Sequence, residues 1–329
     1  MQHDERVILF GLDVTDHKRI FGSTVGLIEQ FGSQRCFATP LSEDAMTGFA
    51  LGAALNGLRP VHVHIRVDFL LLAMNQLVNM ISCYRYMTAG KLSVPLVIRA
   101  VVGRGWGQSF QHSKSLQSVF AHIPGLKVVM PTTPADAKGL LISSIRDDNP
   151  VIFLEHRWLY DTEDEVDENM DSIPLGKANV LLSGNDFTVI AISWMNVEAL
   201  KAADVLKKRG IHIEVIDPRT IVPLDRETLI VSVQKTRRCL VADYDWLFCG
   251  VSAEISALIS ETCFGLLKSP VRRLGFANTP CPSSRVLENA FYPNAKDIVR
   301  AIEQELALKP MDLSQESFYS YEQKFRGPF

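Results

Sequence analysis

The sequence has few cysteines, no basic tract and no hydrophobic run long enough to span a membrane. Its six cysteines include no CxxC pair, so we expect neither a disulfide framework nor a zinc site. Basic and acidic residues are interspersed, and the formal net charge is −3. This charge pattern gives no support to a nucleic-acid-binding function. The polar start MQHDER does not resemble a signal peptide. We therefore expect a cytoplasmic protein with reduced, buried cysteines that binds neither nucleic acid nor membrane.

Short apolar segments alternate with stretches of helical period along the 329 residues. Residues 94–102, VPLVIRAVV, are almost continuously apolar, which is typical of a strand buried on both faces. The alternation predicts an α/β protein with parallel sheets between layers of helices. The strands expected in the first half are residues 7–10, 36–38, 61–65, 94–102, 127–130 and 151–155. The helices expected there are residues 24–31, 43–57, 70–87 and 134–146.

A run of acids, DTEDEVDENMD at residues 161–171, predicts a solvated boundary between two three-layer domains. We assign residues 1–160 to the first domain, 161–185 to an acidic linker, 186–309 to the second domain and 310–329 to a tail. The strands expected in the second domain are residues 187–192, 211–216, 239–242 and 271–274, and its helices are 197–208, 225–233, 251–264 and 295–306. It shows no obvious group of polar residues. The tail mixes aromatic and charged residues, which fits either docking or a loose end.

The stretch at residues 39–57, TPLSEDAMTGFALGAALNG, combines an acid at a helix start with many small residues. Small residues allow another backbone or a flat ligand to approach closely. Glu43 has two interpretations. Ser-Glu at a helix start commonly caps the helix, because serine accepts a backbone N–H and an acid suits the positive helix end. A carboxylate in this place is also a candidate acid–base group.

Several polar segments come directly after expected strands, and the carboxyl ends of parallel strands form one edge where ligands bind. These segments are Glu43, residues 68–69 and the glycine-rich residues 103–112. The glycine pattern is a weak match to a dinucleotide turn, since no clear helix start follows it. His112 at its end is either structural or catalytic, and imidazole titrates near neutral pH.

Long motifs give the chain a family resemblance. They include TPLSEDAMTGFALGAALNGLRPV at residues 39–61, QHSKSLQSVFAHIPGLKVVMPTTPADAKGLL at 111–141, IRDDNPVIFLEH at 145–156 and VIDPRTIVPLD at 215–225. Over residues 7–306 the chain resembles the β subunit of the thiamine-diphosphate-dependent first component of 2-oxo-acid dehydrogenase complexes, of pyruvate, branched-chain and acetoin types. The resemblance implies a transketolase-like pyrimidine-binding domain followed by a transketolase C-terminal domain.

The resemblance also implies roles for single residues. Glu43 matches the glutamate that shares a proton with the cofactor's aminopyrimidine ring, and its carboxyl is expected to be buried. Phe69 matches the aromatic residue stacked on that ring, Ile65 a residue lining the same pocket, and His112 the active-site histidine. The positions that match ligands of a structural potassium ion, largely through backbone carbonyls, are Leu96, Ser144, Ile145, Asp147 and Asn149.

One family motif is missing. The diphosphate of such cofactors is held through Mg²⁺ by a Gly-Asp-Gly followed by an asparagine, and this sequence contains no Gly-Asp-Gly. The resemblance therefore implies that an α subunit carries the Mg²⁺ half of the site, in an α2β2 heterotetramer. The expected function is decarboxylation of a 2-oxo acid, followed by acyl transfer to a lipoyl domain, with a lipoyl acyltransferase core as a further partner.

The sequence departs from the common family pattern around the expected site. His62 and His64 stand in a strand that is usually apolar or acidic, and Trp106 stands in a loop that is usually small. Arg66, Arg104 and Lys114 are further differences, and they could form a cationic mouth for an anionic substrate or acceptor, or else point to solvent or pair with local acids. We name Arg66 and Arg104 as tentative substrate residues. The cationic residues also leave open a split transketolase-like or acyloin-forming enzyme with an aldehyde acceptor.

Overall fold

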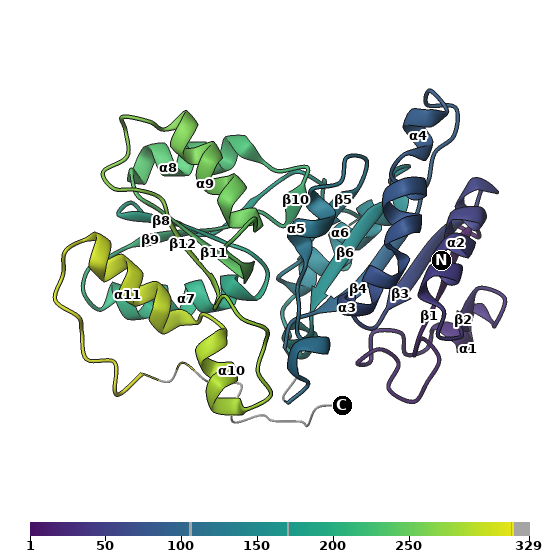
Figure 1. Ribbon diagram of the computed structural model, residues 1–329, viewed down its shortest axis with the longest axis horizontal. Helices are drawn as coiled ribbons and strands as arrows, with labels where there is room; N and C mark the ends of the chain where they lie inside the picture. The colour runs from purple at the N-terminus through teal and green to yellow at the C-terminus, as the bar shows by residue number, and fades with distance from the viewer. Residues whose placement is uncertain (105–106, 170, 317, 319–329) are drawn as a thin grey trace. The chain divides into compact units, whose positions relative to one another are not determined.

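The computed structural model describes residues 1–329 apart from 105–106, 170, 317 and 319–329. Trp106 and most of the predicted tail therefore lie outside the described residues. The chain forms two compact units, each built around one sheet (Figure 1). The first unit comprises Met1–Val102, Ser115–Leu175 and Ile221–Pro223, and the second comprises Gly103–Lys114, Gly176–Thr220 and Leu224–Phe329. The glycine-rich loop thus packs with the second unit, although its sequence lies in the predicted first domain.

The first unit contains a seven-stranded sheet in the order β10-β5-β6-β4-β3-β1-β2. Its strands are β1 (Val7–Gly11), β2 (Cys36–Ala38), β3 (Arg59–His64), β4 (Val97–Val102), β5 (Lys127–Val129), β6 (Val151–His156) and β10 (Thr220–Val222). The pairings described among β1 to β6 are parallel, as the strand–helix alternation predicts. The short β10 comes from much later in the chain and was not expected from the sequence.

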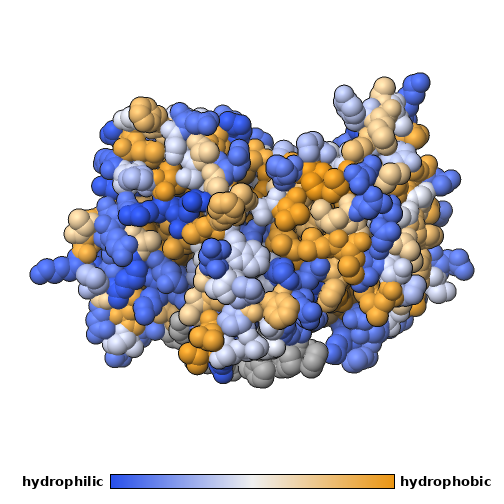
Figure 2. Space-filling model, in the orientation of Figure 1, coloured by the Kyte–Doolittle hydropathy of each residue, from blue (hydrophilic) through white to orange (hydrophobic). Residues whose placement is uncertain are grey.

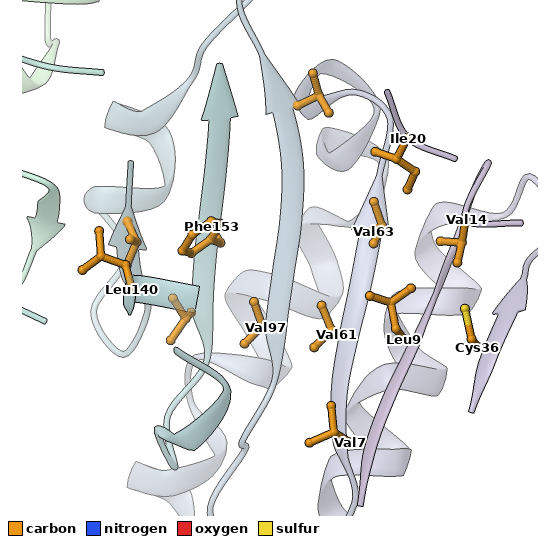
Figure 3. Close-up of a cluster of buried hydrophobic side chains, with 13 residues drawn as sticks. Val7, Leu9, Val14, Ile20, Cys36, Val61, Val63, Val97, Leu140 and Phe153 are labelled. Carbon is orange, nitrogen blue, oxygen red and sulfur yellow. The ribbon is translucent and has the colours of Figure 1, made fainter. Parts of the chain in front are cut away.

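The strands of this sheet are apolar on both faces because helices cover both sides. On one face Val7 and Leu9 of β1 lie beside Val61 and Val63 of β3 (Figure 3). Leu140 of α6 (Pro134–Arg146) belongs to the same cluster. Thr133 and Asp136 form a reciprocal capping box that fixes the start of α6, with Pro134 in its first turn.

The segment after β3 differs from the single long helix expected at residues 70–87. It consists of α3 (Val67–Leu70), a 3₁₀ turn (Leu71–Ala73), a π-helical stretch (Asn75–Ile81) and α4 (Tyr84–Met87). The number of residues per turn changes from one of these segments to the next, which the single helical period assumed from the sequence does not predict. Among the described residues no single helix is long and apolar enough to cross a membrane, although the bent pair Val67–Ala73 and Asn75–Met87 has the length and composition. The other helices of this unit are α1 (Leu27–Phe31), α2 (Glu43–Leu55) and α5 (Gln117–Ala121).

The second unit contains a five-stranded sheet in the order β12-β11-β8-β9-β7. Its strands are β7 (Asn179–Leu182), β8 (Phe187–Ala191), β9 (Ile213–Asp217), β11 (Cys239–Trp246) and β12 (Arg272–Phe276). Its helices are α7 (Trp194–Lys207), α8 (Arg226–Thr236), α9 (Val251–Thr262), α10 (Arg285–Phe291) and α11 (Ala295–Glu305). The edge strand β7 pairs antiparallel with β9, and it lies within the range that the sequence assigned to the linker.

Two segments expected to be solvated or loose make specific contacts within their own units. Arg146 forms an ion pair with Asp171 of the acidic run, and the Nζ atom of Lys138 donates to the carbonyl oxygen of Asp167. At the start of the tail, the backbone N–H of Met311 donates to Glu303 at 2.9 Å, and Leu313 is buried. The described part of the tail is therefore docked.

The expectation of buried cysteines is confirmed in most places but is wrong for Cys249. Cys249 is exposed because it lies in the loop between β11 and α9, outside both elements.

Candidate active site

The predicted site residues Glu43 and Phe69 lie in the first unit, just beyond the carboxyl ends of parallel strands. Glu43 begins α2 shortly after β2, and Phe69 lies in α3 shortly after β3. Both strands belong to the same sheet, so the expectation that they follow one sheet edge is met.

The capping interpretation of the Ser-Glu pair holds only in part. The N-cap residue Ser42 makes no side-chain cap hydrogen bond, so that part is wrong, whereas Glu43 does stand in the first turn of α2, where an acid suits the positive helix end. The carboxylate of Glu43 makes no hydrogen bond or ion pair with any residue that the structure describes. In this chain alone Glu43 is partly buried in the first turn of α2, and burial of its carboxyl in a shared site stays a prediction. A carboxylate without a partner beside a positive helix end is available to a ligand.

Two histidines on β3 are buried, and one of them contacts α2. His62 and His64 are 2% and 1% exposed, and their ring centroids are 4.2 Å apart. His62 also stacks on Phe10 with centroids 4.8 Å apart, and Nε2 of His64 lies 3.4 Å from the hydroxyl of Thr47 on α2. Burial lowers the pKa of His62 from 6.5 to about 4, although a contact with the Phe10 carbonyl opposes the shift. Burial and the neighbouring His62 lower the pKa of His64 well below 6.5.

We expect this histidine pair to make the folded chain sensitive to acid. The unfolded chain takes up protons on both residues near pH 6.5, whereas the folded chain resists protonation of His62 down to about pH 4. Stability should therefore fall as the pH drops through this window, by up to about 3 kcal/mol for His62 alone. Melting temperatures from pH 7 to pH 4 should drop less steeply in His62→Leu/His64→Leu than in the wild type. The exposed His17→Leu variant is the control, and parallel pH curves for the wild type and the double variant would contradict the assignment.

The residues around the expected aromatic contact differ in burial. Phe69 is partly buried, and its backbone N–H donates to the carbonyl oxygen of Arg66 at 3.1 Å. Ile65 is also partly buried and packs against the core cluster of the first unit. Arg66 is only 4% exposed, so it does not extend into solvent.

His112 lies at the end of the glycine-rich loop and is described with the second unit. The loop closes at its base, where the backbone N–H of Gly103 donates to the carbonyl oxygen of Lys114 at 3.3 Å. His112 is partly buried and follows a 3₁₀ turn (Ser109–Gln111). The ammonium group of Lys114 donates back to the carbonyl oxygen of Phe110 within the loop. Glu43 and Phe69 thus belong to one unit, and His112 to the other.

Arg104 enters the interior of the second unit and is 1% exposed. Its Nη2 atom donates to the side-chain oxygen of Asn289 at 2.9 Å, and its guanidinium lies 4.9 Å from the centre of the Tyr292 ring. The alternative that this arginine points to solvent is therefore wrong. Its tentative role toward a substrate stays a prediction, and the cationic mouth loses support because this guanidinium is engaged inside the protein.

The surroundings of Arg104 form a buried polar cluster that sequence reasoning missed. Tyr292 is 4% exposed, and its hydroxyl donates to the carbonyl oxygen of Ser113 at 3.1 Å and lies 3.4 Å from Sγ of Cys281. Glu288 is fully buried, and neither carboxylate oxygen accepts a hydrogen bond from a described residue. Burial raises the pKa of Glu288 to about 7, although the positive charge of Arg104 opposes this shift. Arg104 and Ser113 lie far in the sequence from the segment that carries Glu288 and Tyr292, so no local pattern brings the two parts together.

The positions expected to hold potassium lie close together in the first unit. One atom, Nη1 of Arg59, donates to the carbonyl oxygens of Ile145 at 2.9 Å and Asp147 at 3.2 Å. The carbonyl oxygen of Leu96 accepts from the backbone N–H of Val151 at 2.9 Å. Separately, no group of three or more His, Cys, Asp or Glu residues that could hold a metal ion occurs within the part of the chain that the structure describes.

Family models match both halves of the chain. The transketolase pyrimidine binding domain matches residues 1–162, and the transketolase C-terminal domain matches residues 176–298. A solved structure described as a split gene transketolase, an inactive beta4 tetramer, has a similar fold, with a TM-score of 0.77. It covers 94% of this chain and 95% of its own, but at 22% sequence identity it shows the fold alone.

Characterised relatives match over nearly the whole chain. The pyruvate dehydrogenase E1 component subunit beta of Bacillus subtilis is 42% identical, covering 91% of this chain and 92% of the relative. The acetoin:2,6-dichlorophenolindophenol oxidoreductase subunit beta of the same organism is 40% identical, with 91% of each chain covered. Its 2-oxoisovalerate dehydrogenase subunit beta is 40% identical, covering 93% and 94%. The identities to these three relatives are too similar to show which of them this chain resembles in substrate.

Proposed function

The chain belongs to the family of 2-oxo-acid dehydrogenase β subunits, and we propose from this that it supplies the aminopyrimidine-binding half of a thiamine diphosphate site. The reaction proposed is the decarboxylation of a 2-oxo acid, followed by transfer of the acyl group to a lipoyl domain. The observation that carries the proposal is the carboxylate of Glu43, which stands at the carboxyl edge of a parallel sheet without a partner among the described residues.

The residues of this chain fit one end of such a cofactor. Glu43 would hold a proton and share it with a ring nitrogen, a type of contribution worth about 10²–10⁴-fold in rate. Phe69 would offer a ring face for stacking, and Ile65 an apolar wall. His112 would hold or move a proton at the reacting substrate. When bound, thiamine diphosphate supplies the group that accepts the electron pair as carbon dioxide leaves.

The diphosphate end requires another polypeptide in this proposal, because the sequence lacks a Gly-Asp-Gly to hold Mg²⁺. We propose an α subunit with that motif in an α2β2 assembly, and a lipoyl acyltransferase core as a further partner. Exposed apolar residues on the first unit support a partner; they include Leu41, Phe49, Leu72, Tyr86 and Met87. Figure 2 shows hydrophobic side chains gathered on the visible face of this unit, around the place where Figure 1 labels α3 and β4. On α2, a Cβ atom added at Gly52 would have nothing within 4 Å, which leaves room for a partner's backbone.

The proposal also includes a structural potassium ion in the first unit. The carbonyl oxygens of Ile145 and Asp147 converge, since both reach the same atom of Arg59. A carbonyl oxygen has two lone pairs, so each can accept from Arg59 and also face a cation. We propose that these two carbonyls hold a structural potassium ion together with Leu96, Ser144 and Asn149.

The test is to purify the chain alone and together with an α subunit that contains the Gly-Asp-Gly motif. Carbon dioxide release from pyruvate and from 2-oxoisovalerate would be measured with thiamine diphosphate and Mg²⁺. We expect activity only in the mixed assembly, because each polypeptide carries half of the site. Robust decarboxylation by the chain alone would contradict the shared site, and no decarboxylation of any 2-oxo acid by the purified assembly would contradict the proposed reaction.

A further inference from the structure

The loop that carries His112 is held at both ends by one region of the second unit. At its first end, Arg104 is bonded to Asn289 of α10, and its guanidinium lies over the Tyr292 ring. At its last end, Ser113 is 1% exposed, and its carbonyl oxygen accepts the hydroxyl proton of Tyr292 at 3.1 Å. Tyr292 therefore contacts both ends of the loop.

Tyr292, which anchors the loop, is itself packed on several sides. The ring of Tyr292 stacks on Tyr244 of β11, with centroids 5.0 Å apart and planes 8° apart. It also packs edge-on against Phe276 of β12 and Phe291 of α10. Aromatic rings held on several sides have few accessible rotamers, so the hydroxyl of Tyr292 is fixed relative to the sheet.

Neighbouring groups stabilise the buried positive charge of Arg104. The carboxyl group of Glu288 lies on the same helix as Asn289, and it interacts with Arg104 electrostatically. A buried guanidinium is stable only where hydrogen bonds and nearby negative or aromatic groups replace its hydration. The hydrogen bond to Asn289 and the ring of Tyr292 provide such groups, and the electrostatic interaction with Glu288 adds to them.

We propose that Tyr292 and Arg104 are positioning residues, which fix the loop backbone next to His112 in the orientation that catalysis needs. Tyr292 acts through the carbonyl of Ser113, one residue from His112, and Arg104 fixes the other end of the loop. Neither residue is proposed to touch the substrate. The inference rests on the proposed function, because it assumes that His112 acts in the reaction.

The test compares Tyr292→Phe with Tyr244→Phe in the assembly with the α subunit. Both variants remove one buried hydroxyl from the same aromatic stack, but only Tyr292 bonds to Ser113 among the contacts described. Losing one hydrogen bond of this kind should lower kcat about three- to tenfold and leave KM within about twofold. Tyr244→Phe should leave kcat nearly unchanged.

A second measurement does not depend on activity. Amide hydrogen exchange of residues 107–114 should be faster in Tyr292→Phe than in the wild type, and unchanged in Tyr244→Phe. Arg104→Lys should accelerate it as well, because lysine lacks the planar fork that reaches both Asn289 and the ring. This variant also decides the matter if Tyr292→Phe does not fold.

The outcomes separate this inference from the proposed function. Unchanged exchange in Tyr292→Phe and Arg104→Lys would overturn the anchoring, whatever the activity. Faster exchange with a rise in KM alone would overturn the link to His112. An inactive wild-type assembly would refute the proposed reaction, while the exchange experiment would still report on the anchoring.

Discussion

Replacing Glu43 by glutamine is expected to lower the turnover of the assembled enzyme by at least about 100-fold and to leave the folding of this chain almost unchanged. The loss follows from the acid–base role, since glutamine cannot share a proton with a ring nitrogen. The unchanged folding follows from the structure, because the carboxylate of Glu43 makes no hydrogen bond or ion pair with the described residues, and Ser42 makes no cap bond. Substitutions without such features usually change stability by less than about 0.5 kcal/mol.

Asp44→Asn is a matched control for this experiment. Asp44 is the next residue in the same helical turn, it is exposed, and its carboxylate has only a long contact of 3.4 Å with Gln76. Carbon dioxide release and the melting temperature would be measured for both variants with the α subunit present. Near-wild-type turnover in Glu43→Gln would refute the catalytic role. Equal losses in both variants would indicate an effect of helix charge rather than of one carboxylate.

The central strands of both sheets could be predicted from the sequence, because burial on two faces gives a continuous run of apolar residues, whereas the edge strands β7 and β10 were not predicted. The prediction fails where a segment has no regular repeat of apolar residues. Residues 94–96 precede β4 rather than belonging to it, and Pro95 among them has no N–H to donate to a neighbouring strand. The three residues of β10 are too few to show any alternation. The helix expected at 70–87 is divided into 3₁₀, π and α turns, and a single helical period does not predict these changes in residues per turn.

The candidate site was predictable only in part, for a related reason. The positions of Glu43 and Phe69 follow from strands that precede them closely, so the carboxyl-edge rule finds them. The contacts that hold the His112 loop join residues 185 positions apart for Arg104 and Asn289, and 179 apart for Ser113 and Tyr292. No local propensity reports on such pairs. Tyr292 also follows α10, a seven-residue helix that the sequence did not reveal.

The Arg99–Glu155 pair inside the first unit carries the second large prediction. Arg99 on β4 is 4% exposed, and it reaches Glu155 on β6 through two hydrogen bonds of 2.8 and 3.0 Å. Tyr160 donates its hydroxyl proton to the same carboxylate at 3.0 Å. Burial alone would lower the pKa of Arg99, but the charge of Glu155 outweighs it and raises the pKa.

Arg99→Leu is expected to destabilise the chain by about 3–5 kcal/mol, because it leaves the carboxylate of Glu155, whose side chain is only 13% exposed, without its cation. The double variant Arg99→Leu/Glu155→Gln should recover much of this loss, since it removes the unpaired charge while Tyr160 keeps an acceptor. Urea denaturation of the three proteins measures the difference.

Arg6→Leu is the control for this series, because it breaks the exposed pair with Asp4 and should have little effect. A double variant no more stable than Arg99→Leu would contradict the charge argument and point to packing by the arginine side chain instead. Arg99 lies on the same face of the sheet as Val97 and Val101 of the core cluster, so both explanations predict a large loss for the single variant. Only the double variant can separate a buried charge left unpaired from a core left underfilled.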